Sequence, residues 1–212
     1  MLKRIAAVLL LLISCATVST VHAEDVSARR LLARAEADPE LKARLTQAGK
    51  AAANFCFNCH GDKGISKLSD VPNLAGQHPA YIIDQIEAFL SGRRTDEFMQ
   101  GLMKLLSEEE KASAALFFAT STPIPARPAP GPRAIEGKQL YAEYCARCHR
   151  DDAAGEESFP RLAGQQPDYM RRSLTRYFDM TGERLYPPMT GAVRQLGKHN
   201  IEAIVDYLSA KY

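Results

Sequence analysis

Cysteine and histidine are scarce in this chain outside two short motifs. Its 212 residues include five of each, and beyond those motifs only Cys15, His22, His78 and His199 remain. A structural zinc site would need further Cys or His ligands at close spacing, so the inventory excludes one. A disulfide framework is also a poor interpretation, because it leaves unexplained why a histidine directly follows both cysteine pairs.

Other absences narrow the class of protein. After its first residues the chain has no apolar run that approaches the roughly 20 residues needed to span a bilayer. No alternating pattern of useful length indicates a β-strand. Lys and Arg number 27 against 25 Asp and Glu, and no basic run indicates nucleic-acid binding. The sequence therefore predicts an all-α protein that binds no nucleic acid.

The pattern Cys-Xaa-Xaa-Cys-His occurs twice, at residues 56–60 and 145–149. This spacing is typical of c-type haem attachment. The two thiols can reach the two vinyl groups on one edge of a porphyrin, and the histidine then presents its imidazole to the iron. A thioredoxin-like redox pair would lie in a strand-helix unit, whereas the flanking sequence here is helical. We therefore expect two covalently bound haem c groups, held by Cys56, Cys59, His60, Cys145, Cys148 and His149.

The first 23 residues have the features of a secretory signal peptide. A charged start is followed by an apolar run at residues 5–13 and by an Ala-Xaa-Ala-like cleavage site at residues 21–23. Cleavage after Ala23 would give a soluble periplasmic protein, which agrees with haem attachment outside the bacterial cytoplasm. Residues 12–15 also resemble a bacterial lipobox, so a lipid anchor at Cys15 is the alternative.

A proline-rich linker at residues 123–133 divides the mature chain into two similar halves. It holds five of the twelve prolines, which favours an extended, semi-rigid spacer over a helix. Each half contains one haem motif, so we expect domains at residues 49–122 and 134–212, after a helical extension at 24–48. The matched segments are Gly49-Lys50 with Gly137-Lys138, 72–77 with 160–165, Tyr81 with Tyr169, 99–101 with 189–191, and Leu106 with Leu196.

Local signals predict several helix ends. Asp38-Pro39 is typical of an N-cap followed by proline at the first helical position, and it opens a helix that leads to the first haem motif. Residues 80–90 have an amphipathic helical pattern. Residues 107–110 have a capping-box pattern before the closing helix of the first half.

An electron carrier needs a second axial ligand on each iron. The candidates are Met99, Met103 and His78 in the first half and Met170, Met180, Met189 and His199 in the second. Met99 and Met189 follow their haem histidines by 39 and 40 residues and share the pattern Met-Xaa-Gly. The repeat therefore predicts that His60 and Met99 ligate one iron and that His149 and Met189 ligate the other. Such ligation raises the haem potential relative to bis-histidine ligation.

The remaining candidates fit the repeat less well. Met103 aligns with a valine, and Met170 and Met180 align with no methionine. His78 aligns with a glutamine, and His199 lies in a polar segment that is typical of solvated surface residues. None of them is predicted to ligate iron.

Taken together, these motifs resemble those of the cytochrome c4 family. The resemblance rests on the two haem motifs, the proline-containing linker and the Pro-Xaa-Leu-Ala-Gly-Gln stretch after each motif, and it covers about residues 49–208. It implies two tandem, mostly helical class I cytochrome c domains, related by a pseudo-two-fold axis, with the haem propionates near their interface. It also implies a periplasmic electron carrier and the same axial ligands, His60, Met99, His149 and Met189.

The sequence departs from the family pattern at several points. Residues 24–47 form a longer charged N-terminal segment than the family pattern has. Tyr169 is followed by Ser173 where the family tends to have glutamine, and two prolines precede Met189 where Glu97-Phe98 precede the matched methionine. These differences indicate that the two haem environments are unequal.

The two halves also differ in charge. Residues 24–122 hold 12 basic and 14 acidic side chains, and residues 123–212 hold 13 and 11. Such polarity can orient a docking partner. Because ferric iron carries one more positive charge than ferrous iron, a cationic surround disfavours it, and we expect the second haem to have the higher potential.

We expect a dihaem electron shuttle without catalytic activity of its own. Its partners would be redox proteins such as a terminal oxidase, a cytochrome bc complex or a periplasmic dehydrogenase. It would contact a membrane only through a partner or through an anchor at Cys15. One alternative is a cytochrome subunit bound tightly to a dehydrogenase, such as a sulfide-oxidising flavoprotein, with residues 24–47 as its attachment element. A dihaem peroxidase-like enzyme is the other, although the matched halves argue against it.

Overall fold

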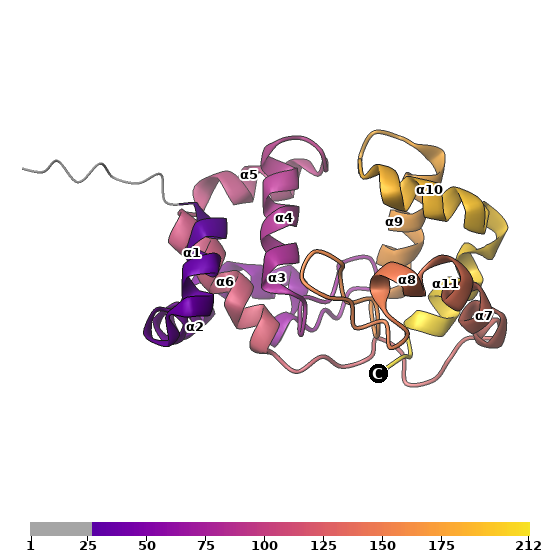
Figure 1. Ribbon diagram of the computed structural model, residues 1–212, viewed down its shortest axis with the longest axis horizontal. Helices are drawn as coiled ribbons and strands as arrows, with labels where there is room; N and C mark the ends of the chain where they lie inside the picture. Colours follow the sequence, from indigo (N-terminus) through magenta and orange to yellow (C-terminus); the bar gives the residue numbers. More distant parts are fainter. Residues whose placement is uncertain (1–26) are drawn as a thin grey trace, which may run out of the picture.

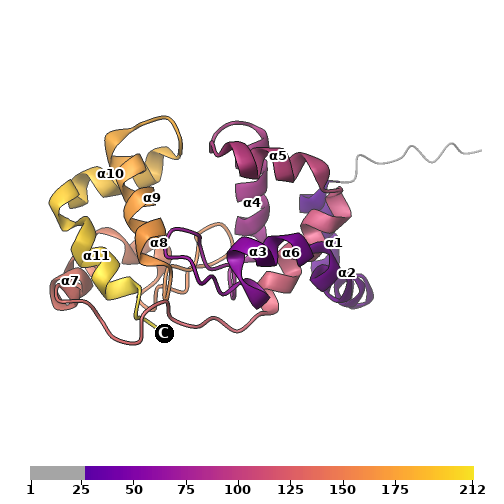
Figure 2. The same ribbon diagram turned by 180° about the vertical axis from the view of Figure 1, so that it is seen from behind.

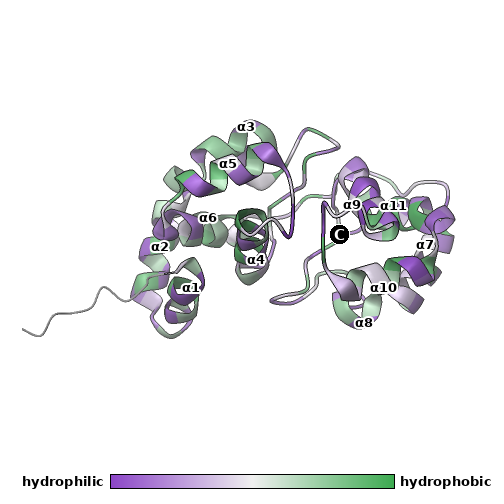
Figure 3. Ribbon diagram, turned by 90° about the horizontal axis from the view of Figure 1, so that it is seen from above, coloured by the Kyte–Doolittle hydropathy of each residue, from purple (hydrophilic) through white to green (hydrophobic). Residues whose placement is uncertain are grey.

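The computed structural model describes residues 27–212, and the predicted signal peptide, its cleavage site and Cys15 lie outside the described residues. The chain forms two helical lobes that lie next to each other along the long axis (Figure 1). The view from behind in Figure 2 shows the same two lobes, with the connection from α6 to α7 passing below them. Figure 3 shows that helices in both lobes mix hydrophobic and hydrophilic residues, as expected for elements with one face in a core and the other in water.

The first lobe contains α1 (Ala28–Ala37), α2 (Pro39–Ala52), α3 (Phe57–His60), α4 (Pro79–Leu90), α5 (Glu97–Leu105) and α6 (Glu108–Thr120). The second contains α7 (Ala134–Tyr144), α8 (Ala146–His149), α9 (Pro167–Asp179), α10 (Pro187–Leu196) and α11 (Ile201–Leu208). Single 3₁₀ turns occur at Asn54–Cys56, Asp62–Gly64 and Lys198–Asn200. Residues 27–212 contain isolated β-bridges but no strand, which confirms the predicted all-α class. None of the described helices is long and apolar enough to cross a bilayer.

The two lobes repeat the same arrangement, with α2 to α6 corresponding to α7 to α11. In each lobe the first helix of the repeat crosses the last at a glycine. A Cβ added at Gly49 would lie 2.4 Å from the carbonyl oxygen of Ser113, and one added at Gly137 would lie 1.9 Å from that of Ala203. The matched glycines of the sequence are therefore explained by the close approach of α2 to α6 and of α7 to α11.

The predicted helix starts are confirmed by their hydrogen bonds. The side chain of Asp38 accepts from the backbone N–H groups of Glu40 and Leu41, and Pro39 occupies the first turn of α2. Ser107 and Glu110 form a capping box at the start of α6. At both helix starts, these side chains accept hydrogen bonds from backbone N–H groups that have no partner within the helix.

The extension before the repeat is part of the first lobe. Helix α1 adds four buried side chains to that lobe's core: Ala28, Leu31, Leu32 and Ala35. The backbone N–H of Ala28 donates to Oε2 of Glu108 at 2.7 Å. Helix α2 runs continuously through residue 48, so the predicted boundary between extension and domain falls inside a helix. The apolar face of α1 is therefore covered by its own lobe.

The proline-rich linker lies against the second lobe. Its segment around Arg127 and Gly131 is bound to α11, where Arg127 forms an ion pair with Asp206 at 3.0 Å and the N–H of Gly131 donates to the carbonyl of Asp206 at 3.2 Å. The N–H of Arg127 also donates to the carbonyl oxygen of Ser209 at 3.0 Å. The linker thus has a defined path as well as the stiffness that its prolines predict.

Candidate haem sites and the interface between them

The two haem-motif histidines are held in the same orientation. His60 and His149 end the one-turn helices α3 and α8 and are 8% and 4% exposed. Nδ1 of His60 lies 2.9 Å from the carbonyl oxygen of Pro72, and Nδ1 of His149 lies 3.0 Å from that of Pro160. A carbonyl oxygen only accepts hydrogen bonds, so Nδ1 carries the proton and Nε2 keeps its lone pair for a metal.

The free nitrogens are suited to iron. Nε2 of His149 is buried and has no hydrogen-bond partner among the residues that the structure describes. A buried polar atom without a partner is costly, and ligation of an iron would satisfy it. Burial lowers the pKa of both His60 and His149, although the proline carbonyls oppose this effect, so the imidazoles are neutral and able to ligate. The residues present therefore fit a haem in each lobe.

The cysteines of both motifs are unpaired. Cys56, Cys59, Cys145 and Cys148 are free thiols in the part of the chain described here. Burial raises the pKa of Cys56, and it raises that of Cys145 to about 12. Residues 27–212 contain no cluster of three or more His, Cys, Asp or Glu side chains that could bind a metal ion.

The predicted methionine ligands occupy matched positions on α5 and α10. Met99 and Met189 are both half-buried, and Met99 packs against the core of the first lobe. Met103 and the aligned Val193 are each 3% exposed, which supports the alignment of the repeat and a core role for Met103. Met170 is also a core side chain. Ligation by Met99 and Met189 stays a prediction.

The remaining ligand candidates lie at the surface or at the interface between the lobes. Met180 is 59% exposed and its sulfur accepts from Arg194 at 3.1 Å. His199 is exposed, as expected for a polar segment. His78 is half-buried, and its Nε2 lies 2.8 Å from the carbonyl oxygen of Ala154 in the opposite lobe. His78 is therefore an interface residue.

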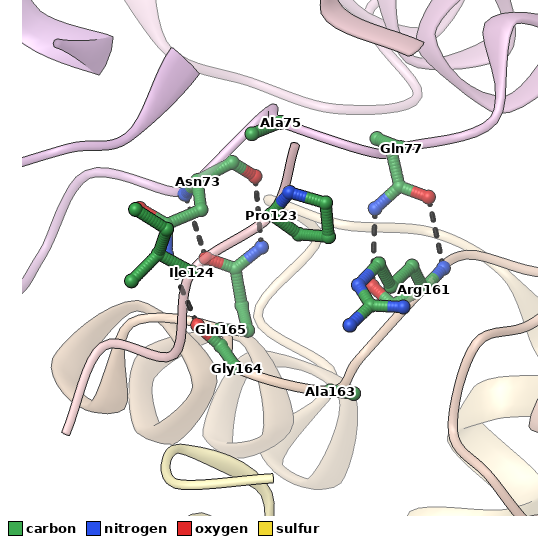
Figure 4. A pocket seen from close by; sticks show the side chains of 9 residues that line it. All are labelled: Asn73, Ala75, Gln77, Pro123, Ile124, Arg161, Ala163, Gly164 and Gln165. Carbon is green, nitrogen blue, oxygen red and sulfur yellow. Dashed lines mark hydrogen bonds between the residues drawn. The ribbon is translucent and has the colours of Figure 1, made fainter. Parts of the chain in front are cut away.

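Two glutamines at the interface were not singled out from the sequence. Nε2 of Gln77 donates to the carbonyl oxygen of Arg161 at 3.0 Å, and its Oε1 accepts from the N–H of Arg161 at 2.8 Å. Gln165 makes the same pair of bonds to Asn73, at 3.0 Å and 2.7 Å (Figure 4). Gln77 aligns with Gln165 and Arg161 with Asn73, so the bonds are reciprocal. The Gly-Gln ending of both matched segments was the available signal.

A cluster of arginine and tyrosine side chains forms a second part of the interface. Arg184 donates to the hydroxyl oxygens of Tyr81 and Tyr169, both at 2.9 Å. The aligned Arg94 donates to the Tyr169 hydroxyl at 3.3 Å. Within residues 27–212 neither guanidinium forms an ion pair with a carboxylate. Backbone bonds between the loops join the lobes nearby, including one of 2.9 Å from the N–H of Thr95 to the carbonyl of Glu183.

A two-lobed helical chain with one Cys-Xaa-Xaa-Cys-His motif in each lobe has the architecture of a dihaem c-type cytochrome. Comparison with known proteins agrees with this class: the cytochrome c family model matches residues 134–210. Cytochrome c4 of Thiocapsa roseopersicina is 34% identical over 177 residues, covering 76% of this chain and 90% of the relative. The chain therefore belongs to the cytochrome c4 family and is an electron carrier.

Two further similarities extend this result. The crystal structure of reduced recombinant cytochrome c4 from Pseudomonas stutzeri matches with a TM-score of 0.71 and 25% identity, over 79% of this chain and 98% of the other. The thiosulfate dehydrogenase electron acceptor of Thiomonas intermedia (strain K12) is 30% identical, over 75% of this chain and 79% of the relative. The expected family and the expected pair of class I cytochrome c domains are confirmed.

Proposed function

We propose that this protein is exported to the periplasm and carries one covalent haem c in each lobe, with both irons ligated by histidine and methionine. It moves single electrons between redox proteins and has no catalytic activity of its own. The observation that carries the proposal is the matched pair of imidazoles. Each is fixed through Nδ1 by a proline carbonyl, which leaves Nε2 for the iron.

The chain's own residues would hold and orient the cofactor. Cys56 and Cys59 in the first lobe, and Cys145 and Cys148 in the second, would bind the porphyrin edge covalently. The bound haem supplies one-electron chemistry at its iron. Met99 and Met189 would complete the coordination of the irons, leaving no position for a substrate, and the burial of His60 and His149 limits access of water to the imidazoles.

The interface arginines support a place for the haem propionates. Arg94 and Arg184 bring two positive charges between the lobes, where tyrosine hydroxyls are their partners. Both arginines are half-buried, and a charge that is partly removed from water is stabilised by a compensating charge. We therefore assign these guanidinium groups to the anionic propionates, which would lie near the interface as the family resemblance implies.

Intact mass measured under denaturing conditions tests the cofactor count. The mature polypeptide should be heavier by two haems than its sequence alone. Its mass and N-terminal residue would also separate cleavage after Ala23 from lipidation of Cys15. A product with one haem, or with none, would contradict the proposal.

Spectra of methionine variants test the axial ligands. Met99→Ala and Met189→Ala should each remove about half of the thioether-to-iron charge-transfer band of the oxidised protein, because each lobe contributes one such ligand. Met103→Leu is the matched control on the same helix and should leave the band intact. Loss of the band in the control would show that the repeat is misaligned.

The alternative of a dehydrogenase subunit is favoured by one observation. A relative of this chain is named as a thiosulfate dehydrogenase electron acceptor, and such a role would make a periplasmic dehydrogenase the electron donor. Purification from the native host at rising salt concentration separates the two cases. A free carrier elutes alone, whereas a subunit stays with a stoichiometric enzyme. For the peroxidase-like alternative, peroxide-dependent turnover by the purified protein would be required.

A further inference from the structure

One peptide group connects each haem histidine to the opposite lobe. His60 donates from Nδ1 to the carbonyl oxygen of Pro72 at 2.9 Å. The N–H of that same peptide group belongs to Asn73, and it donates to Oε1 of Gln165 at 2.7 Å. The imidazole of the first lobe is thereby linked, through one peptide group, to a side chain of the second.

The reverse connection is built from the aligned residues. His149 donates from Nδ1 to the carbonyl oxygen of Pro160 at 3.0 Å. The N–H of this peptide group, which belongs to Arg161, donates to Oε1 of Gln77 at 2.8 Å. We call each series of imidazole, peptide group and glutamine a relay.

Both glutamines are fixed in position by further bonds. Gln77 and Gln165 are 6% and 7% exposed. The Nε2 of each returns a bond of 3.0 Å to the carbonyl oxygen of the residue it binds. Their Oε1 atoms also accept from the backbone N–H of the next residue, His78 at 3.2 Å and Gln166 at 2.8 Å. Bulk water has little access at this site, so the glutamine is the partner that determines how strongly the peptide N–H is bound.

Such a series changes the electron density at the iron ligand. Hydrogen bonds in a chain polarise one another, so a peptide group that donates through its N–H accepts more strongly at its oxygen. A stronger acceptor at Nδ1–H makes the imidazole a more basic ligand. A more basic ligand stabilises ferric iron relative to ferrous iron and so lowers the haem potential.

We infer that Gln165 tunes the potential of the haem on His60 and that Gln77 tunes the haem on His149, each across the interface between the lobes. Both are positioning residues that act through a peptide group. The inference rests on axial ligation by the two histidines, which is part of the proposed function. It goes further, because it makes each lobe a determinant of the other lobe's redox potential.

A glutamine that only holds the lobes together would act differently. Loosening the interface would alter both haems to a similar extent, or would affect the haem in the lobe that carries the substitution. The relay instead requires a crossed effect. Gln165→Met removes both bonds at nearly constant side-chain size, and it should raise the potential of the haem on His60 alone. Gln77→Met should raise that of the haem on His149 alone.

The measurement is a redox titration of the two-haem protein followed by NMR, with the resonances of each haem assigned to its lobe. In the reduced state the Nδ1–H resonance of His60 should also move upfield in Gln165→Met, because its hydrogen bond weakens. Gln165→Glu keeps an acceptor at Oε1 and should restore that resonance. The glutamate variant keeps one of the interface bonds of Gln165. Its Nδ1–H resonance and haem potentials can therefore be measured even if the methionine variant folds poorly.

Gln166→Met is the matched control. Gln166 is equally buried and donates across the interface to the carbonyl oxygen of Ser66 at 2.8 Å and to the side-chain Oδ1 of Asn73 at 3.1 Å, but its side chain forms no bond to the relay peptide group. It should leave the Nδ1–H resonance of His60 in place. An equal shift in the control, a shift of both haems together, or no shift in either glutamine variant would overturn the inference. Absence of two attached haems in the wild type would instead overturn the proposed function.

Discussion

The two lobes share one fold but differ in the polarity of the side chains on one corresponding face. In the first lobe Ile83 and Ala112 are 1% and 0% exposed and lie in the same core cluster as Leu31 of α1. At the aligned positions the second lobe has Arg171 and Glu202, whose side chains form an ion pair with an Nη2–Oε2 distance of 2.9 Å. The face that is apolar in the first lobe is charged in the second.

This difference explains why the chain begins with an additional helix. An apolar face of a small helical lobe must be covered, since a large exposed patch promotes association. Helix α1 covers that face in the first lobe and is joined to α4 by a bond of 2.6 Å from Arg29 to Glu87. In the second lobe the corresponding face carries charged side chains that are exposed to water. Helix α1 thus has a structural role in the first lobe that follows from the apolar residues of α4 and α6.

The feature that both lobes share should be the most sensitive to substitution. Gly137→Ala and Gly49→Ala each add a Cβ within 2.5 Å of a backbone oxygen at a helix crossing, and a backbone atom cannot turn aside as a flexible side chain can. We expect a loss of about 3 kcal/mol or more in the free energy of unfolding for each variant. Denaturant unfolding followed by circular dichroism and haem absorbance measures this.

A matched pair of glycines provides the control for the helix crossings. Gly101 on α5 and Gly191 on α10 have nothing within 4 Å of an added Cβ. Alanine at these positions should be neutral or stabilising by up to about 1 kcal/mol, because it has the higher helix propensity. A loss at Gly101 as large as that at Gly49 would show that the crossing is not the cause.

The next largest effect concerns the helix that only the first lobe carries. Leu31→Ala removes a buried side chain from the contact between α1 and its lobe, and we expect a loss of about 2–3 kcal/mol in the free energy of unfolding. Ala33→Ser on the exposed face of the same helix should change it by no more than about 0.5 kcal/mol. If both variants were equally stable, α1 would not be part of the core.

The ion pair that replaces this helix in the second lobe should contribute much less. The side chains of Arg171 and Glu202 are 38% and 46% exposed, so water and salt screen their attraction. A double-mutant cycle with Arg171→Ala and Glu202→Ala should give a coupling energy below about 1 kcal/mol, decreasing as salt is added. A larger coupling that salt leaves unchanged would contradict the view that this face is solvated.

The smallest expected difference is between the two haem potentials. The relays are matched, with N–H···O distances of 2.7 and 2.8 Å, and therefore act on both haems alike. The charges differ, at 12 basic and 14 acidic residues in 24–122 against 13 and 11 in 123–212, so we expect the second haem to have the higher potential. A redox titration with assigned haems should show the gap narrowing at high ionic strength. A higher potential at the first haem than at the second would rule out net charge as the determinant of this difference.

Features that depend on short-range chemistry could be predicted from the sequence. The haem motifs follow from covalent reach between neighbouring residues, and the Asp38 and Ser107 caps follow from bonds across one helical turn. The repeat allowed Met103 to be assigned to the core, because its counterpart is a valine. The repeat becomes recognisable only within α2, after that helix has begun, so the boundary predicted at residue 48 falls inside a helix.

The sequence by itself determined the family, the all-α class and the two matched lobes, and it predicted the residues that would hold the haems. Only the tertiary structure decided how the lobes face each other, that α1 is a core helix, and that His78 and two glutamines bind across the interface. The interface bonds of the glutamines join residues 84 and 92 positions apart. Such pairs leave no local periodicity or spacing in the chain, because their geometry exists only once both lobes have folded and packed together.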